Sequence, residues 1–239
     1  MVLRDYRLAV VMAELTDRNE ERRIQDISKE FKRQLEYRIL SRAEISELAQ
    51  IDRTELIEHI YYLRDGALVL EKEHWDVPDW NPEEKQRRIA VLQQIYDKGA
   101  TFFGAFDGPI LVGMASLEHE PLHSGVDRLN LAGLWVSYPY RGKGVGRALF
   151  QLVEQEARER GAKALYVSAT PSENTVRFYR SVGFQLAKLV DPDLYEEEPE
   201  DIHMELILRQ QQSWSTNFHR ITLRRSPPRR VSIQPNDSL

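Results

Sequence analysis

The chain of 239 residues carries a formal net charge of −5, is 41% hydrophobic and contains no cysteine. This length allows one domain with extensions or two small domains, with enough apolar residues for a core. The lack of cysteine excludes disulfides, thiolate zinc sites and a cysteine nucleophile. The absence of cysteine also leads us to expect a cytoplasmic protein. No apolar run approaches the roughly 20 residues that a membrane-spanning helix needs, so we expect no membrane span.

Charge is distributed unevenly along the chain. Six arginines and one aspartate give residues 209–239 a charge of +5, which leaves −10 on residues 1–208. An acidic body argues against nucleic acid as its main ligand and permits a cationic substrate. Residues 209–239 are rich in Pro, Ser, Gln and Arg, which predicts a disordered basic tail. Contact of this tail with a membrane surface or nucleic acid stays an open alternative.

Residues 1–36 are predicted to form two short amphipathic helices, because apolar residues recur there every three or four positions. This N-terminal extension could dock a partner, form a homodimer contact or pack on its own body.

A domain follows over residues 37–208. It begins with a short strand, "YRILS", and continues with one or two helices at residues 43–63. A further helix is capped by Asn81 and ended by Gly99.

The rest of the domain alternates strands and helices. An Asp-Gly turn joins the first two of its strands into a hairpin. The predicted elements are three strands, a helix, a strand, a helix and two strands, at residues 100–106, 110–118, 128–136, 144–160, 164–169, 172–183, 184–190 and 202–208. This order predicts an α/β (α+β) fold with a mixed sheet and helices on its faces.

The segment "YRGKGVGRALF" at residues 140–150 opens the helix after the third strand. A nucleotide-hydrolysing P-loop needs Ser or Thr after its lysine to hold magnesium, but Gly144 follows Lys143 here. A dinucleotide fingerprint needs Gly-x-Gly-x-x-Gly after a first strand, and that spacing is also absent. The segment fits the pattern Arg-x-x-Gly-x-Gly, with Arg141, Gly144 and Gly146.

Such a loop can bind a phosphate group. Successive backbone N–H groups at the start of a helix point toward one anion, and the helix dipole adds positive charge. Arg141, Lys143 and Arg147 can add charge at the rim. Because a hydroxyl for magnesium is missing, we expect a pyrophosphate that is bound and not cleaved. The alternative is a glycine-rich turn with solvated cations.

The segment "HEPLH" at residues 119–123 matches the His-Glu-x-x-His pattern of zinc proteases. That chemistry requires both histidines on one face of a helix. Here Pro121 lies between them, and a proline in a helix interior removes a hydrogen-bond donor and clashes with the preceding turn. We therefore expect a loop here, and no metal.

Two segments of the domain resemble the GNAT superfamily of N-acetyltransferases. "LNLAGLWVSYPYRGKGVGRALFQLVEQEARERGA" is similar to its acetyl-CoA-binding segment, and "LYVSATPSENTVRFYRSVGF" to the strand and helix that follow. The order and spacing of the two segments also match. The resemblance covers residues 37–208. It implies a mostly antiparallel central sheet flanked by helices, in which two central strands splay apart.

The resemblance implies acetyl-CoA as the acetyl donor. The pantetheine arm would pair with the strand before the loop, and the pyrophosphate would lie on the loop. The tyrosine of the family's Phe-Tyr pair corresponds to Tyr179 here. In the family an asparagine commonly stands seven residues before it. This chain has Ser172 at that position, so Asn174 is the expected substitute. The implied cofactor-binding residues are Leu134, Trp135, Val136, Arg141, Gly142, Lys143, Gly144, Val145, Gly146, Arg147 and Asn174.

The resemblance also implies a direct reaction. A free amine would attack the thioester without an acyl-enzyme, and Tyr179 would protonate the departing thiolate. Because the amine must be neutral to attack, a base is needed, and we predict Glu118. The alternatives are an ordinary aromatic core residue at position 179 and a surface glutamate at position 118.

Acidic and aromatic residues indicate a cationic acceptor. On the predicted helix, Glu55, Glu58 and Tyr62 share one face. The segment "HWDVPDW" and the seven acids of residues 191–201 could add to the same pocket, although that acidic run could also be a solvated loop.

The sequence thus predicts an acetyl-CoA-dependent N-acetyltransferase that acetylates the primary amine of a small cationic molecule. Acetylation of a protein N-terminus or lysine is one alternative. A CoA-binding sensor or scaffold without turnover is the other.

Overall fold

The computed structural model describes residues 35–122 and 127–208. The predicted N-terminal helices and the predicted basic tail lie outside these residues, as does His123. Within the described ranges, no helix is long and apolar enough to cross a membrane.

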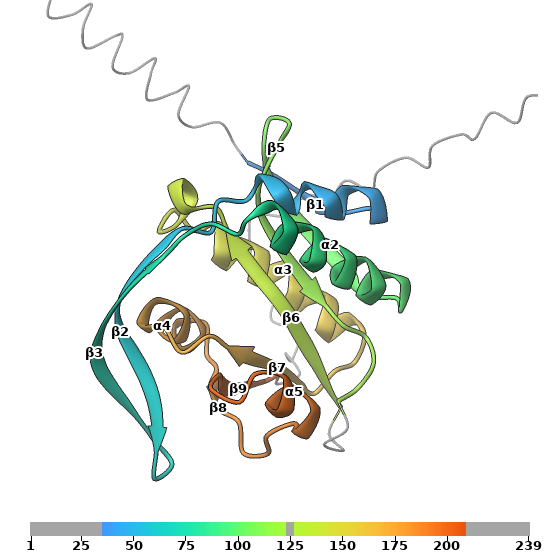
Figure 1. Ribbon diagram of the computed structural model, residues 1–239. Helices are drawn as coiled ribbons and strands as arrows, with labels where there is room; N and C mark the ends of the chain where they lie inside the picture. Colours follow the sequence, from blue (N-terminus) through green and yellow to red (C-terminus); the bar gives the residue numbers. More distant parts are fainter. Residues whose placement is uncertain (1–34, 123–126, 209–239) are drawn as a thin grey trace, which may run out of the picture. The chain divides into compact units, whose positions relative to one another are not determined.

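A seven-stranded sheet forms the centre of the domain (Figure 1). Neighbouring strands are antiparallel except β6 and β7, which run parallel. The mixed, mostly antiparallel sheet is therefore confirmed. In spatial order its strands are β1 (Glu36–Ile39), β4 (Thr101–Asp107), β5 (Ile110–Leu117), β6 (Arg128–Val136), β7 (Ala164–Ala169), β9 (Ile202–Ile207) and β8 (Gln185–Leu186).

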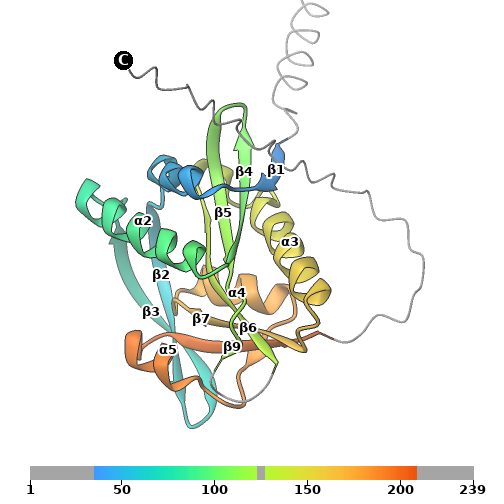
Figure 2. The ribbon, with the colours of Figure 1, turned by 90° about the vertical axis from the view of Figure 1, so that its right-hand side faces the viewer.

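Helices cover both faces of the sheet. Helix α3 packs on β4, β5 and β6, whereas η1 and α2 pack together on the opposite face (Figure 2). Helix α2 begins as predicted, because the Asn81 side chain accepts a hydrogen bond from the N–H of Glu84 (2.9 Å). The helical segments are η1 (Arg42–Gln50), α2 (Pro82–Asp97), η2 (Tyr138–Tyr140), α3 (Val145–Glu159), α4 (Glu173–Ser181) and α5 (Pro192–Glu197).

A long β-hairpin replaces the helix predicted after residue 50. Strand β2 (Glu55–Arg64) pairs antiparallel with β3 (Ala67–Val77). Asp65 and Gly66 form the turn with φ angles of 50° and 78°, the left-handed conformations of a tight hairpin turn. The helix prediction was wrong because the β-branched and aromatic residues of β2 favour a strand, and because an Asp-Gly pair between two apolar runs signals a hairpin.

The end of the domain also differs from expectation. The acidic run contains the short helix α5, which Asp191 caps by accepting a hydrogen bond from the N–H of Leu194 (3.4 Å). The strand predicted for residues 184–190 is reduced to the two residues of β8.

The hairpin is attached to the start of α4. The N–H of Tyr61 donates to the carbonyl of Pro171 (2.8 Å). His59 Nδ1 lies 3.0 Å from Glu173 Oε2. The hairpin therefore runs beside α4, as Figure 1 shows.

Gly104 in β4 faces a filled core. A Cβ atom there would lie 2.6 Å from Leu40 Cδ2 and 2.7 Å from the ring of Phe106.

We expect Gly104→Ala to lower the free energy of unfolding by about 1–3 kcal/mol, the usual cost of overpacking, measured by urea unfolding. In a Leu40→Val background the loss should be smaller, because the obstructing methyl group is gone. Additive effects of the two substitutions would contradict the packing argument.

Candidate active site

Strands β6 and β7 diverge in the middle of the sheet. They pair at three positions only, and the last pair joins Asn130 to Tyr166. Strand β6 nevertheless continues to Val136 and stays paired with β5 along that length. Beyond Asn130, one edge of β6 therefore faces a gap instead of a neighbouring strand (Figure 1).

The register of β5 and β6 shows which main-chain groups face this gap. The N–H of Ser137 donates to the carbonyl of Val112 (2.9 Å), so hydrogen-bonded pairs recur at every second residue before it. Trp135 therefore pairs with β5, whereas the main-chain groups of Leu134 and Val136 point into the gap. Of the three β6 residues predicted to meet a pantetheine arm, two have the required orientation.

Trp135 has a different place from the one predicted. Its main-chain groups face β5, and its ring packs edge-on against Trp80, with ring centroids 6.0 Å apart. The ring also covers Gly133, where a Cβ atom would lie 2.1 Å from it. Trp135 therefore belongs to the packing on the α2 face of the sheet.

The loop after β6 has the geometry of an anion site. Gly142 and Gly144 adopt φ angles of 71° and 86°, which L-amino acids with a side chain rarely adopt. Among the described residues, no well-aligned backbone hydrogen bond uses the N–H groups of residues 142–147. Val145 is buried and holds the start of α3 in place. Six successive N–H groups and the positive end of α3 thus lie together.

Cationic side chains beside the loop have separate roles. Lys143 is exposed, with its ammonium 5.6 Å from the centre of the Tyr140 ring. Arg147 is exposed and donates from Nη2 to Ser181 Oγ (3.2 Å). That these two side chains add charge at the rim of the loop stays a prediction.

Arg141 braces the loop from inside. Its Nε donates to the carbonyl of Val136 (3.0 Å) and its Nη2 to the carbonyl of Arg53 (3.0 Å). Nη1 lies 3.6 Å from Glu55 Oε2. The guanidinium is thus held by the protein itself, and the sequence pattern could not show this because Arg53 and Glu55 lie far away along the chain.

Glu55 and Asn174 lie together. Asn174 Nδ2 donates to Glu55 Oε1 (3.1 Å), so Glu55 connects α4 to Arg141. The sequence analysis expected Asn174 to contact the cofactor and Glu55 to contact the acceptor. In the structure the two side chains are hydrogen-bonded to each other. Ser172 is buried and caps α4, accepting from the N–H of Thr175 (3.3 Å).

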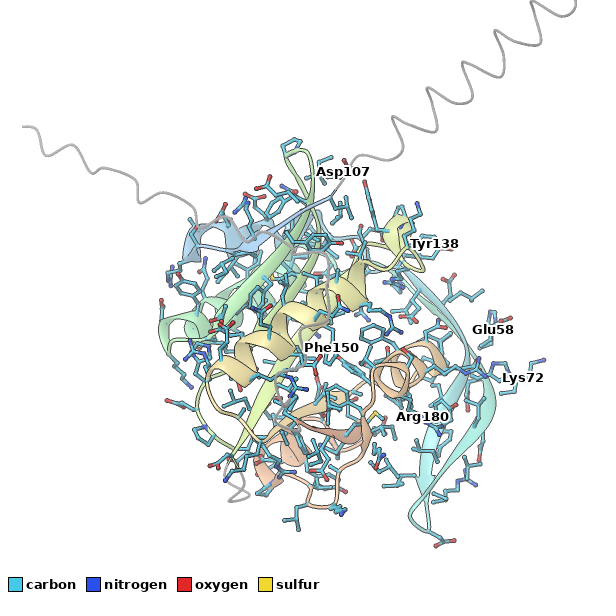
Figure 3. All side chains as sticks on the ribbon, turned by 180° about the vertical axis from the view of Figure 1, so that it is seen from behind. Glu58, Lys72, Asp107, Tyr138, Phe150 and Arg180 are labelled. Atoms are coloured by element: carbon cyan, nitrogen blue, oxygen red, sulfur yellow. The ribbon has the colours of Figure 1, made fainter. Side chains whose placement is uncertain are left out.

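The other two predicted acceptor residues lie on the hairpin. Glu58 is exposed, and Figure 3 shows it at the outer side of the hairpin. Tyr62 donates from its hydroxyl to Glu73 (3.3 Å) and is also exposed. The shared helix face predicted for them and Glu55 does not exist, because all three lie in β2.

Tyr179 lies between two phenylalanines on the inner side of α4. Only 5% of its surface is exposed, and its ring centre lies 5.2 Å from that of Phe178 and 5.3 Å from that of Phe184. Its hydroxyl has no hydrogen-bond partner among the described residues. Burial, reinforced by the charge of Asp201, raises the pKa of Tyr179 well above its usual value. The phenol is therefore protonated at neutral pH and able to donate a proton.

Glu118 lies at the closed end of the gap. Its Oε2 accepts a hydrogen bond from Asn130 Nδ2 (3.1 Å), in the last residue pair that joins β6 to β7. Burial raises the pKa of Glu118, while the hydrogen bond from Asn130 opposes that change. A half-buried carboxyl is thus present where the sequence placed a base.

A second carboxyl near the gap belongs to the acidic run of residues 191–201, from which the sequence did not single it out. Asp201 precedes β9 and accepts a hydrogen bond from Ser168 Oγ (3.2 Å) at the end of β7. Burial, followed by a hydrogen bond that protonated Asp201 donates to Glu198 and by the charge of Glu198, raises the pKa of Asp201 to about 7. The sequence showed Asp201 only as one of seven acids in a short run, and nothing in that run predicts that Asp201 meets Ser168 at the end of β7.

The described part of the zinc-protease pattern, residues 119–122, is not helical, as predicted. His119 Nε2 is 3.0 Å from Thr101 Oγ1, and residues 118–122 contain no helix. Among residues 35–122 and 127–208, no three His, Cys, Asp or Glu side chains are grouped so that they could hold a metal ion.

Comparison with known proteins agrees with this architecture. Over 91 residues the chain is 35% identical to N-acetyltransferase 8 and 34% identical to N-acetyltransferase 8B, both of Rattus norvegicus. Each alignment covers 37% of this chain and 41% of the relative, so the chain spans about two fifths of the curated relatives it matches.

Solved structures share the fold. Nourseothricin acetyltransferase superposes with a TM-score of 0.55 at 22% identity, over 73% of this chain and 99% of that one. A protein of Bacillus anthracis str. Ames, assigned as a streptothricin acetyltransferase and crystallised with acetyl coenzyme A, gives 0.52 at 18% identity, over 72% and 98%. The model of the acetyltransferase (GNAT) family matches residues 67–184. The family match and the shared fold identify this segment as a GNAT acetyltransferase domain.

Proposed function

We propose that the chain transfers the acetyl group of acetyl-CoA to a primary amine. The observation that carries this proposal is that the open edge of β6 and the anion loop are continuous. The open edge of β6 leads directly into a loop with six unpaired N–H groups. A ligand with an extended amide-bearing arm and a pyrophosphate fits both, and acetyl-CoA has this chemistry.

The residues present fit such a ligand. The N–H groups of residues 142–147 would bind the pyrophosphate, with Lys143 and Arg147 at the rim. The main-chain groups of Leu134 and the N–H of Val136 would pair with the amides of the arm. When bound, acetyl-CoA supplies the activated acetyl group. The related fold crystallised with acetyl coenzyme A supports this choice of donor.

The reaction is a direct transfer in a ternary complex. The amine nitrogen bonds to the acetyl carbon, the carbon–sulfur bond breaks, and the sulfur accepts a proton. Tyr179 gives that proton, because its phenol is neutral and is not committed to another described residue. No cysteine is present to form an acyl-enzyme.

The acceptor is a small cationic amine. Glu118 and Asp201 place two carboxyls beside the gap, and α5 brings Glu197 close enough for its charge to raise the pKa of Glu118. Negative groups attract a cation. Streptothricin and nourseothricin acetyltransferases, which share the fold, are consistent with a small-molecule acceptor.

An amine panel tests this function. Thiol release from acetyl-CoA would be followed with polyamines, a streptothricin, an aminoglycoside, and peptides carrying a free N-terminus or a lysine. We expect turnover with at least one small amine. Turnover with peptides alone would favour a protein acetyltransferase. CoA binding without any turnover would favour a sensor or scaffold, and absence of CoA binding would refute the proposal.

Tyr179→Phe tests the acid. We expect kcat to fall about 100-fold or more, because a positioned general acid contributes roughly 10²–10⁴ to a rate. The KM for acetyl-CoA should change little, since the ring and its packing are retained. Tyr96→Phe, in the α2 core, is the matched control and should keep the wild-type rate. An unchanged kcat for Tyr179→Phe would remove Tyr179 from the mechanism.

Arg141→Lys tests the loop. Lysine keeps the charge but cannot reproduce the fork that joins Val136, Arg53 and Glu55. We expect CoA binding, measured by calorimetry, to weaken about tenfold or more. Lys143→Met removes an exposed charge without disturbing the loop and should weaken binding less. The reverse ranking would show that charge, and not loop shape, determines affinity.

A further inference from the structure

We propose that the Asp201 carboxylate takes the proton from the acceptor amine. This inference rests on the proposed function and concerns the one catalytic step for which the sequence offered only Glu118. It identifies a residue from the acidic run, whose other members are mostly exposed.

Asp201 lies at the open end of the gap. Ser168, which donates to Asp201 Oδ2 (3.2 Å), lies two residues beyond Tyr166, the last β7 residue that pairs with β6. Ser168 pairs with His203 of β9, and Asp201 precedes His203 by two residues, so all three project from the same face of the sheet. The carboxyl therefore lies beside the part of β7 that β6 has left.

The proposed acid and base flank this end of β7. Tyr179 comes from α4, and the charge of Asp201 is close enough to raise the pKa of Tyr179. One group can therefore give a proton to the sulfur while the other takes one from the nitrogen. Glu118 lies at the closed end of the gap instead, with its carboxylate bound to the amide of Asn130.

The surroundings of Asp201 suit a base at neutral pH. Its own segment contributes the carboxyls of Glu198 and Glu200, α4 contributes Tyr179, and β7 contributes the hydroxyl of Ser168. Burial is the largest influence on its pKa, followed by the hydrogen bond and charge of Glu198, and the result is a pKa of about 7. A base is most effective when its pKa lies near the working pH.

The proton balance of the step is complete. The nitrogen–carbon bond forms as the carbon–sulfur bond breaks. One proton leaves the nitrogen for the Asp201 carboxylate, and one leaves the Tyr179 hydroxyl for the sulfur. The products are an acetylated amine and free CoA thiol, and solvent later returns the two protein groups to their starting state.

The test is the pH profile of kcat/KM for an amine that the wild type acetylates. Wild type should gain activity through a midpoint near pH 7. Asp201→Asn should lose about 100-fold or more at pH 7, and the loss should shrink toward pH 9–10, where the amine itself becomes neutral. Asp201→Glu should recover part of the rate. The KM for acetyl-CoA should stay unchanged in both variants.

Glu118→Gln is the matched control, because it removes the other half-buried carboxyl. It should keep the midpoint near pH 7. Ser168→Ala should move the midpoint to higher pH, since the lost hydrogen bond stabilises the charged carboxylate. The inference is overturned if the pH profile of kcat/KM for Asp201→Asn matches that of the wild type. It is also overturned if the midpoint near pH 7 disappears in Glu118→Gln. In both cases the proposed function stands. A wild type that acetylates no amine overturns both.

Stability gives a readout that does not depend on activity. The folded pKa of Asp201 lies above its unfolded value, so the folded state holds an extra proton between about pH 4 and pH 7, and stability falls as the pH rises through that window. Asparagine cannot ionise. The melting temperature of Asp201→Asn relative to wild type should therefore rise from pH 4.5 to pH 7.5. A constant difference would show that Asp201 does not titrate in this range and would overturn the inference.

Discussion

The parallel pairing of β6 and β7 ends after three residue pairs, although β6 runs six residues further. The main-chain groups of Leu134 and Val136 are thereby left without a strand partner inside a sheet. The Val136 carbonyl accepts a hydrogen bond from Arg141 Nε, whereas the main-chain groups of Leu134 and the N–H of Val136 can pair with a ligand that brings its own amides. The anion loop follows the end of this edge, and the proposed base Asp201 is bound to Ser168, two residues beyond the last β7 residue that pairs with β6.

Several long-range contacts keep the edge and the loop in place. Arg141 returns from the loop to the carbonyl of Val136 and so connects the end of β6 to the start of β2 through Arg53 and Glu55. Glu55 in turn holds Asn174 of α4. The hairpin is thus joined to both the anion loop and the helix that carries Tyr179, which explains why this departure from the predicted helix bears on the active site.

Local signals sufficed for most elements after Asn81. Caps, turn residues and apolar periodicity predicted α2, α3, α4 and the strands between them. The hairpin was not predicted, because the apolar residues of β2 also recur at helical spacing and only the Asp65-Gly66 turn indicates the strands. The side-chain partners of Arg141, Glu55 and Asn174 depend on contacts between distant segments, and neither motif nor spacing contains that information. Asp201 was not distinguished within the run of seven acids for the same reason: its contact with Ser168 of β7 joins segments that lie far apart in the sequence.

Amide hydrogen exchange with and without saturating acetyl-CoA tests the central claim most directly. If the β6 edge and the loop bind the arm and pyrophosphate, the N–H groups of Leu134 and Val136 and those of residues 142–147 should become protected. The N–H of Trp135, already bonded to β5, should change little and serves as an internal reference. Unchanged exchange at Leu134, Val136 and the loop, with acetyl-CoA demonstrably bound, would contradict the account.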